Sequence, residues 1–433
     1  MELNVPQEYL ITDPRKTNEF KGKTISNFKK RDVINGLQDA MVNQNIEDAC
    51  RWFIELNCSN YNFDIWIEIV TSYCKHVNIN NFRLLELIFK KYNYYIQIVS
   101  NIDKKNEIHL RNNQEIRHLY TNLICQVALS IKNDLFNKRK IPKVKEVDFQ
   151  REGLLKNMKC TNLDLIIDLV NENDIKEFKI AVNEISYHIR VSQNFTMAVF
   201  WYQWICKLSS LKKKAGIQLT INTFNIGGIQ DKYKSDWIWL LWKILLNETM
   251  RKTNKRLTYV IKMLYKLYKI NYKTSDINKR HFMIYQVIYC IIKQVNFAKC
   301  SKIKDHLCLQ AQMNINKMYQ AIDYNISKTY HNSTNFIEKE NYVQKIQQDL
   351  HNEELKKKNQ ADKKVEKKDK QQTKEEYETT NKLSYLNDLM FIKKSFDKTS
   401  EKSCNKHPDN KKIPDYFNDK KDDNKIIYKN IIY

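Results

Sequence analysis

The sequence predicts an all-α protein, and three observations support this fold class. Only 6 Gly and 5 Pro occur in 433 residues, about 2.5% of the chain against roughly 12% in average proteins. Phosphate-binding loops, nucleophile elbows and tight hairpins need glycine for φ > 0 or for close backbone approach. Apolar residues recur at helical spacing, with short gaps that favour antiparallel neighbours. We expect two packed helical blocks, as a helical bundle or an irregular α-solenoid, followed by a charged tail.

The first predicted block spans residues 28–133 and follows an N-terminal extension, residues 1–27. Pro6, Pro14 and Gly22 predict that this extension is an extended arm. Aspartate side chains before apolar stripes mark two candidate helix starts, with Asp32 and Asp64 as the expected caps. We expect another helix to begin at Ile46 or Glu47, and further helices over 82–95 and 116–131.

The second predicted block spans residues 151–337 and follows a basic, Pro142-containing linker at 134–150. Its expected helices are 163–170, 175–189, 196–208, 235–248, 257–272, 280–297 and 303–329. The longest irregular stretch is 212–234, which holds half of the glycines. It is either a short hairpin over 217–224 or a mobile functional loop.

Residues 338–433 form the predicted tail, which is polar on every face after Leu355. Such composition is typical of a solvated single helix or of a disordered segment. One apolar stretch in it, 383–396, is a candidate binding segment for a protein partner. We expect no membrane partner, because the chain contains neither a signal peptide nor an apolar run of about 18 residues.

Cysteine spacing and missing motifs argue against several kinds of site. The ten cysteines include no C-x-x-C pair, so we expect reduced thiols in a cytosolic or nuclear compartment. No Walker A, G-x-G-x-x-G, G-x-S-x-G or H-E-x-x-H motif occurs, so we expect no catalytic residue and no cofactor. Three side chains, Cys300, His306 and Cys308, are close enough in sequence to share a metal. They lack the partner pair that zinc sites usually have, and we expect no metal.

Two further patterns favour structural roles. Glu184 and His188 are one helical turn apart, a spacing typical of a hydrogen bond on one helix. The aromatic clusters fall on strongly apolar helices, which predicts core packing over base stacking. These clusters are Trp52/Phe53, Phe200/Trp201/Tyr202/Trp204 and Trp237/Trp239/Trp242.

The distribution of charge points to a polyanionic partner. The net charge is +24, and residues 340–433 hold 22 basic and 18 acidic side chains, so the preceding residues carry +20. Over 257–268, one helix face is apolar, while lysines repeat at turn intervals on another. A row of cations one turn apart can follow a phosphate backbone and release its counterions. The predicted nucleic-acid-binding residues are Arg251, Lys252, Lys255, Arg256, Lys262, Lys266, Lys269 and Lys273, with Lys212, Lys213 and Lys214 added from the loop. The alternative is that an AT-rich genome enriched lysine without selection for binding.

Four segments, 110–133, 178–189, 198–208 and 231–248, carry a resemblance to known proteins. They resemble a family of helical proteins from large nucleocytoplasmic DNA viruses of the mimivirus-like kind, over roughly residues 28–300. The resemblance implies a place in the virus factory of the host cytoplasm or in the virion. It implies no activity and therefore no catalytic residue.

Residues 32–70 carry a second resemblance, through Ala40, Glu47-Asp48-Ala49, Trp52, Glu55-Leu56 and Trp66. This segment is similar to the C-terminal helical collar of clamp-loader-like AAA+ proteins. Because the sequence shows no ATPase domain ahead of it, the resemblance implies oligomerisation or docking at replication machinery, without ATP hydrolysis.

Taken together, these features predict a non-enzymatic accessory protein that binds DNA or RNA without sequence specificity, in replication or transcription. The alternative function is a scaffold or virion-associated protein that binds protein partners through its tail. The sequence leaves the oligomeric state open.

Overall fold

The computed structural model describes residues 5–100, 102–136, 138–160, 162–171, 174–217, 219–221, 226–299 and 305–330. These residues form two compact units. Unit 1 takes its described residues from Met1–Asn133 and Ala298–Glu376, and unit 2 takes them from Asp134–Phe297. Within the described ranges the regular structure is helical, with only two isolated β-bridges, Lys23–Lys29 and Thr220–Asp236. The predicted all-α class is confirmed.

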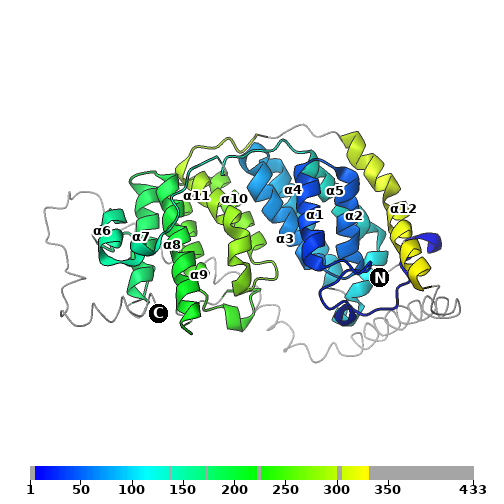
Figure 1. The fold of residues 1–433 in the computed structure, drawn as a ribbon. Coiled ribbons are helices and arrows are strands. Elements are labelled where there is room, and N and C mark those ends of the chain that lie inside the picture. The colour runs from blue at the N-terminus through cyan, green and yellow to red at the C-terminus, as the bar shows by residue number, and fades with distance from the viewer. Residues whose placement is uncertain are drawn as a thin grey trace, which may run out of the picture. The chain divides into compact units, whose positions relative to one another are not determined.

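The described residues of unit 1 include six α-helices, which pack against both sequence neighbours and distant helices (Figure 1). The largest contacts join α1 to α2, α12 to α5, and α2 to both α5 and α12. Apolar residues at helical spacing form the buried faces, as in α1 with Val33, Leu37, Ala40 and Met41. The helices are α1 Lys30–Val42, α2 Ile46–Cys58, α3 Asn62–Ser72, α4 Phe82–Val99, α5 Gln114–Leu129 and α12 Asp305–Tyr330.

Helix α12 corrects the predicted domain boundary, which placed 303–329 in the second block. The helix belongs to unit 1, where Tyr319 Oη donates a 2.7 Å hydrogen bond to Asn57 Oδ1 of α2. Asn316 Nδ2 donates to Gln114 Oε1 of α5 at 2.9 Å. Periodicity predicted the helix itself, but it carries no information on which distant partner covers its apolar face.

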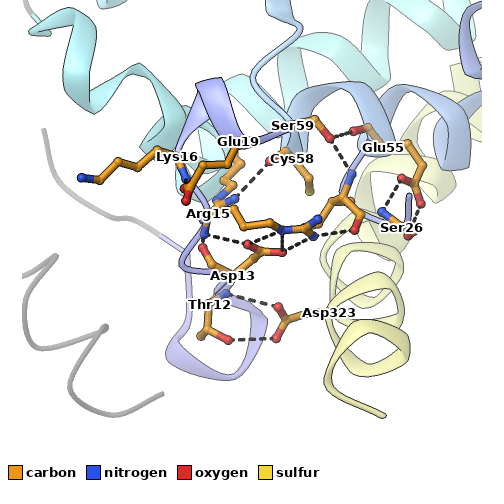
Figure 2. Close-up of polar contacts among 12 residues, drawn as sticks. Thr12, Asp13, Arg15, Lys16, Glu19, Ser26, Glu55, Cys58, Ser59 and Asp323 are labelled. Atoms are coloured by element: carbon orange, nitrogen blue, oxygen red, sulfur yellow. Dashed lines mark hydrogen bonds and ion pairs between the residues drawn. The ribbon is translucent and has the colours of Figure 1, made fainter. Parts of the chain in front are cut away.

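The N-terminal segment is also packed, and the expectation of an extended arm at 1–27 is wrong for its described residues. Ile11, Phe20 and Ile25 are buried in unit 1. Figure 2 shows how polar contacts fix the segment: the Asp323 carboxylate of α12 accepts from Thr12 N and Oγ1 at 3.2 and 3.3 Å. Ser26 Oγ donates to Glu55 Oε1 of α2 at 2.6 Å. The segment therefore joins α2 and α12.

Two buried arginines complete this closure of unit 1. The Arg111 guanidinium donates to the carbonyl oxygens of Cys58 and Asp13. The Arg117 guanidinium donates to the oxygens of Tyr9 and Arg111, and its carbon lies 3.8 Å from the Tyr319 ring centroid. Burial lowers the pKa of Arg117 from its ordinary value, but a guanidinium stays protonated in proteins. Backbone carbonyls thus accept many of the hydrogen bonds of these two guanidinium groups. The sequence pattern does not predict that either arginine is buried.

The described residues of unit 2 also include six α-helices, α6 to α11 (Figure 1). Helix α8 packs on α7 and α11, and α10 packs on α9 and α11. The predicted linker is partly integrated, since Phe136 and Phe149 are buried in this unit. The helices are α6 Arg151–Asn157, α7 Lys176–Arg190, α8 Phe195–Lys214, α9 Ile238–Arg251, α10 Lys255–Tyr268 and α11 His281–Ile292.

Tryptophan packing forms the core of unit 2, in agreement with the expected packing role of the aromatic clusters. Trp201, Trp237 and Trp242 are almost completely buried. Trp204 stacks on Phe149 with ring centroids 4.8 Å apart, which attaches the predicted linker to α8.

Asparagines begin five helices, whereas the expected caps Asp32 and Asp64 lie inside the first turns of α1 and α3. Each asparagine carbonyl accepts the third backbone N–H of its helix, the preferred capping bond. The caps are Asn45, Asn81, Asn113, Asn194 and Asn254. Asn27, Asn60, Asn78 and Asn271 also adopt positive φ, which glycine usually supplies. Asparagine therefore occupies several of the positive-φ positions for which other proteins use glycine.

Local predictions in unit 2 need three corrections. Residues 163–170 form turns instead of a helix, since an isolated short helix is marginal without packing. Helix α6 was missed because its sequence, REGLLKN, carries only one apolar pair. Helix α8 runs to Lys214, so the irregular stretch begins later than expected.

Several predictions fall on residues outside the described ranges. These are the tail at 338–433 with its apolar stretch 383–396, Cys300, and half of the hairpin alternative at 217–224. The described part of that hairpin pairs Thr220 with Asp236.

Candidate nucleic-acid interface

The junction between α9 and α10 positions the predicted cationic residues. Arg251 ends α9, and Lys252 is its C-cap. Thr253 turns the chain with φ = 51°, an uncommon conformation for a β-branched residue. The Asn254 side chain then caps α10 by accepting from Leu257 N at 3.0 Å. The turn is short, so basic residues from both helices lie at one end of the pair.

Helix α10 has one apolar and one basic face, as the sequence predicts. Leu257, Ile261, Leu264 and Tyr268 are buried against the unit. On the other side, five residues follow at intervals of four and three, which keeps them within an arc of about 80°. We call them the basic stripe: Lys255, Tyr259, Lys262, Lys266 and Lys269. Between Arg251 and Lys273 the chain holds eight basic residues and no acidic one.

The contacts of these cations differ along the stripe. Within the described part of the chain, no carboxylate forms an ion pair with Lys255 or Lys262. Lys273 was predicted to share this helix face, but α10 ends at Tyr268 and Lys273 has an extended backbone outside the stripe. Lys269, in contrast, is half-buried and donates to Gly227 O at 3.0 Å. It is held against the preceding loop and is the least available amine of the stripe.

A surface hollow lies beside the N-terminal half of the stripe. Its volume is about 380 Å³, near the lower end of the range for ligand sites. Its wall combines two amines, one aromatic ring, one thioether and two hydroxyls. The lining residues are Met250, Thr253, Lys255, Thr258, Tyr259 and Lys262.

Tyr259 is the residue that the sequence analysis missed. Its side chain is 46% exposed, although most large aromatic residues of unit 2 are buried. The Arg256 guanidinium carbon lies 5.5 Å from its ring centroid, within the range of a cation–π contact. The sequence could have indicated this residue by its position, because Tyr259 occupies a site in the four–three spacing of the stripe at which a lysine would be expected.

The structure places Lys212, Lys213 and Lys214 differently from the prediction. They form the last turn of α8, not part of an irregular loop. Lys212 is paired with Glu177 of α7, with 3.7 Å between Nζ and Oε1. Helix α8 makes its main contacts with α7 and α11, whereas the stripe lies on α10.

Glu184 and His188 form a buried structural pair. Glu184 Oε1 accepts from the backbone N–H groups of Lys159 and Cys160 at 2.8 and 2.7 Å, and Oε2 lies 3.5 Å from His188 Nε2. Burial raises the pKa of Glu184 and lowers that of His188 to about 4. The imidazole is therefore neutral at physiological pH, and the pair fixes the chain before residue 161 on α7.

The possible metal ligands are not gathered together where they are described. Cys308 is buried in unit 1 and His306 is exposed, although they are only two residues apart. In the described ranges, no three His, Cys, Asp or Glu side chains form a group that could hold a metal. Nor does any described helix combine the length and apolarity needed to cross a bilayer.

Comparison of the chain with protein-family models, with curated proteins and with solved structures finds no match.

Proposed function

We propose that this protein binds nucleic acid without sequence specificity, through the basic stripe of α10. The observation that carries the proposal is a rigid helix face whose cations lie one or two turns apart, with no acidic residue between Arg251 and Lys273. Four residues along an α-helix span about 6 Å, a spacing that lets successive amines reach successive phosphates. Lysine amines act as point charges toward phosphates, so the proposed contacts are to the backbone, which carries no sequence information.

The fixed geometry distinguishes this face from a general surplus of lysine. Leu257, Ile261 and Leu264 anchor α10 in the core, so the amines of one face keep their mutual spacing. Lys255 and Lys262 belong to the stripe, and neither forms an ion pair with a carboxylate among the described residues. Counterions released from phosphates then supply the free energy of binding. The proposal includes no catalytic step, and its setting is replication or transcription in the cytoplasm of a virus-infected host cell.

A salt titration of binding tests the proposal. Fluorescence anisotropy measures the affinity for a labelled oligonucleotide from about 50 to 200 mM salt, and the slope of log K against log salt counts the contacts. Replacing Lys255, Lys262 and Lys266, the three lysines of the stripe that lie within α10, by glutamine lowers the magnitude of the slope by about 2 for a single strand and about 3 for a duplex.

The matched control removes the same charge from unit 1. Lys21, Lys23 and Lys29 are exposed, and their replacement by glutamine leaves the slope close to that of the wild type. Absence of measurable affinity at about 50 mM salt overturns the proposal. Equal slopes for the two triple variants show instead that total charge, and not the stripe, drives binding.

One observation favours the alternative function, a scaffold. Leu309 and Met313 lie one turn apart on α12 and are 59% and 82% exposed. Such a pair fits the recognition of an apolar protein surface. Light scattering and pull-down with the Leu309→Ser/Met313→Ser variant test this function: loss of partners with nucleic-acid affinity intact supports it, and unchanged partners contradict it.

A further inference from the structure

The hollow beside the stripe suggests which form of nucleic acid the protein prefers. It contains the exposed ring of Tyr259, which a set of backbone contacts alone does not need. Lys255 precedes Tyr259 by four residues and Lys262 follows it by three, so the two amines flank the ring along the helix axis. Their distances along the axis are about 6 and 4.5 Å.

The other walls of the hollow suit the face of a flat heterocycle. Met250 contributes a polarisable thioether, which makes favourable contacts with aromatic rings. The hydroxyl groups of Thr253 and Thr258 donate to the carbonyl oxygens of Lys252 and Asn254, at 2.9 and 3.1 Å. Their oxygens keep lone pairs that can accept from an N–H group of a base, such as N3–H of thymine.

The ring itself is supported from its own helix. Arg256 lies 5.5 Å from the centroid of Tyr259 and restricts its motion through a cation–π contact. The Asn254 cap fixes the first turn of α10, to which Lys255 and Arg256 belong. The ring of Tyr259 therefore lies on a capped helical turn with a guanidinium beside it.

We infer that the hollow holds one unstacked base of a single strand, against the ring of Tyr259, with the adjoining phosphates on Lys255 and Lys262. The inference rests on the proposed function and adds the class of ligand. In a duplex the bases are paired and stacked, and their faces cannot reach a side chain. Stacking accepts any base, so this site is compatible with binding that does not read sequence.

The test compares three labelled ligands of equal length by fluorescence anisotropy: oligo-dT, the same strand with abasic spacers, and a duplex. The abasic strand keeps its phosphates and lacks every base. We expect wild-type protein to bind oligo-dT about 5- to 100-fold more tightly than the abasic strand, the range measured for stacking of one base on an aromatic side chain. An oligo-rU arm shows whether the sugar matters.

Two substitutions locate the effect. Tyr259→Ala removes the preference for oligo-dT over the abasic strand, while Tyr259→Phe retains it, because a ring without the hydroxyl still stacks. Tyr94 in unit 1 is exposed to a similar extent, and Tyr94→Ala leaves the preference unchanged. Circular dichroism of the variants verifies that the helices remain folded.

The outcomes separate this inference from the function on which it rests. If abasic and dT strands bind equally, or if Tyr259→Ala keeps the wild-type preference, the base does not enter the hollow and the inference fails. The proposed function still stands in that case if the triple lysine variant loses salt-dependent binding. If that variant also binds like the wild type, both ideas are wrong.

Discussion

Replacing Arg117 by methionine tests how unit 1 is closed. The guanidinium makes four hydrogen bonds to the oxygens of Tyr9, Arg111, Asn112 and Asn316, at 2.7 to 3.1 Å. These acceptors belong to the N-terminal segment, to the chain before α5 and to α12. Methionine keeps much of the aliphatic volume and removes every donor. The substitution therefore separates the hydrogen bonds from the packing of the stem.

The expected loss is smaller than the sum of the bonds. A hydrogen bond to a charged group contributes about 1.5–3 kcal/mol, but removing the guanidinium also removes the cost of burying its charge. Methionine leaves these neutral oxygens without their donor, and each buried polar group left unsatisfied costs about 1–3 kcal/mol, so we expect a loss of about 4 kcal/mol in total. Because two units need not unfold together, a single melting curve is not a suitable measure.

Native-state hydrogen exchange measures the effect locally. We expect the amides of α12 to lose about 1,000-fold in protection, which corresponds to about 4 kcal/mol, while those of unit 2 are unchanged. Arg51, an exposed arginine of α2, provides the control, and Arg51→Met should change protection by less than about threefold. Wild-type protection of α12 in the Arg117→Met protein would refute the role given to this residue.

Three further predictions concern unit 2. Asn254→Ala removes the α10 cap and should destabilise the helix by about 1 kcal/mol, which hydrogen exchange at the first turn of α10 measures. Asn254→Asp retains the cap and is the control. Equal exchange in the two variants would contradict the predicted loss. The pKa of His188 is about 4 in the folded protein and about 6.5 in the unfolded chain. As the pH drops from 6.5 toward 4, the unfolded chain takes up a proton that the folded protein does not bind, so stability falls. Between pH 7 and 5 the proton uptake of His188 lowers the free energy of unfolding by about 2 kcal/mol. Glu184 partly offsets this loss, because its raised pKa favours proton uptake by the folded state. Denaturant titrations should give a flatter pH profile of stability for His188→Gln, and an unchanged profile would assign the loss to other groups. Gly153→Ala should destabilise α6, because the new Cβ would lie 2.7 Å from the carbonyl carbon of Val147. This is expected although alanine is the better helix former by about 1 kcal/mol. Greater helicity and stability of the variant would contradict the prediction and show that the backbone at Val147 can shift.

Much of the local structure was predictable because it depends on neighbours in the chain. The apolar spacing of Val33, Leu37 and Met41 gave α1, and that of Leu257, Ile261 and Leu264 gave α10. The basic stripe was predictable for the same reason, since residues three and four apart share a helix face. The hollow was not, because it needs Met250 of α9 beside Tyr259 of α10.

The errors have related causes. Residues 163–170 have a helix-like apolar spacing, yet Ile166 and Leu169 reach the core from turns. Lys212, Lys213 and Lys214 were assigned to a loop because three adjacent lysines carry no apolar periodicity. In the structure they extend α8, where Lys212 finds Glu177 on the neighbouring helix.

The sequence by itself determined the fold class, the identity of most helices and the cationic face of α10. Scarce glycine and proline leave the backbone few alternatives to the helix, and helical periodicity is a local property. Only the tertiary structure decided that α12 and the N-terminal segment close unit 1, and that Arg111 and Arg117 lie inside it. Those features depend on contacts such as Thr12 with Asp323, 311 residues apart, and no local pattern encodes which distant groups will meet.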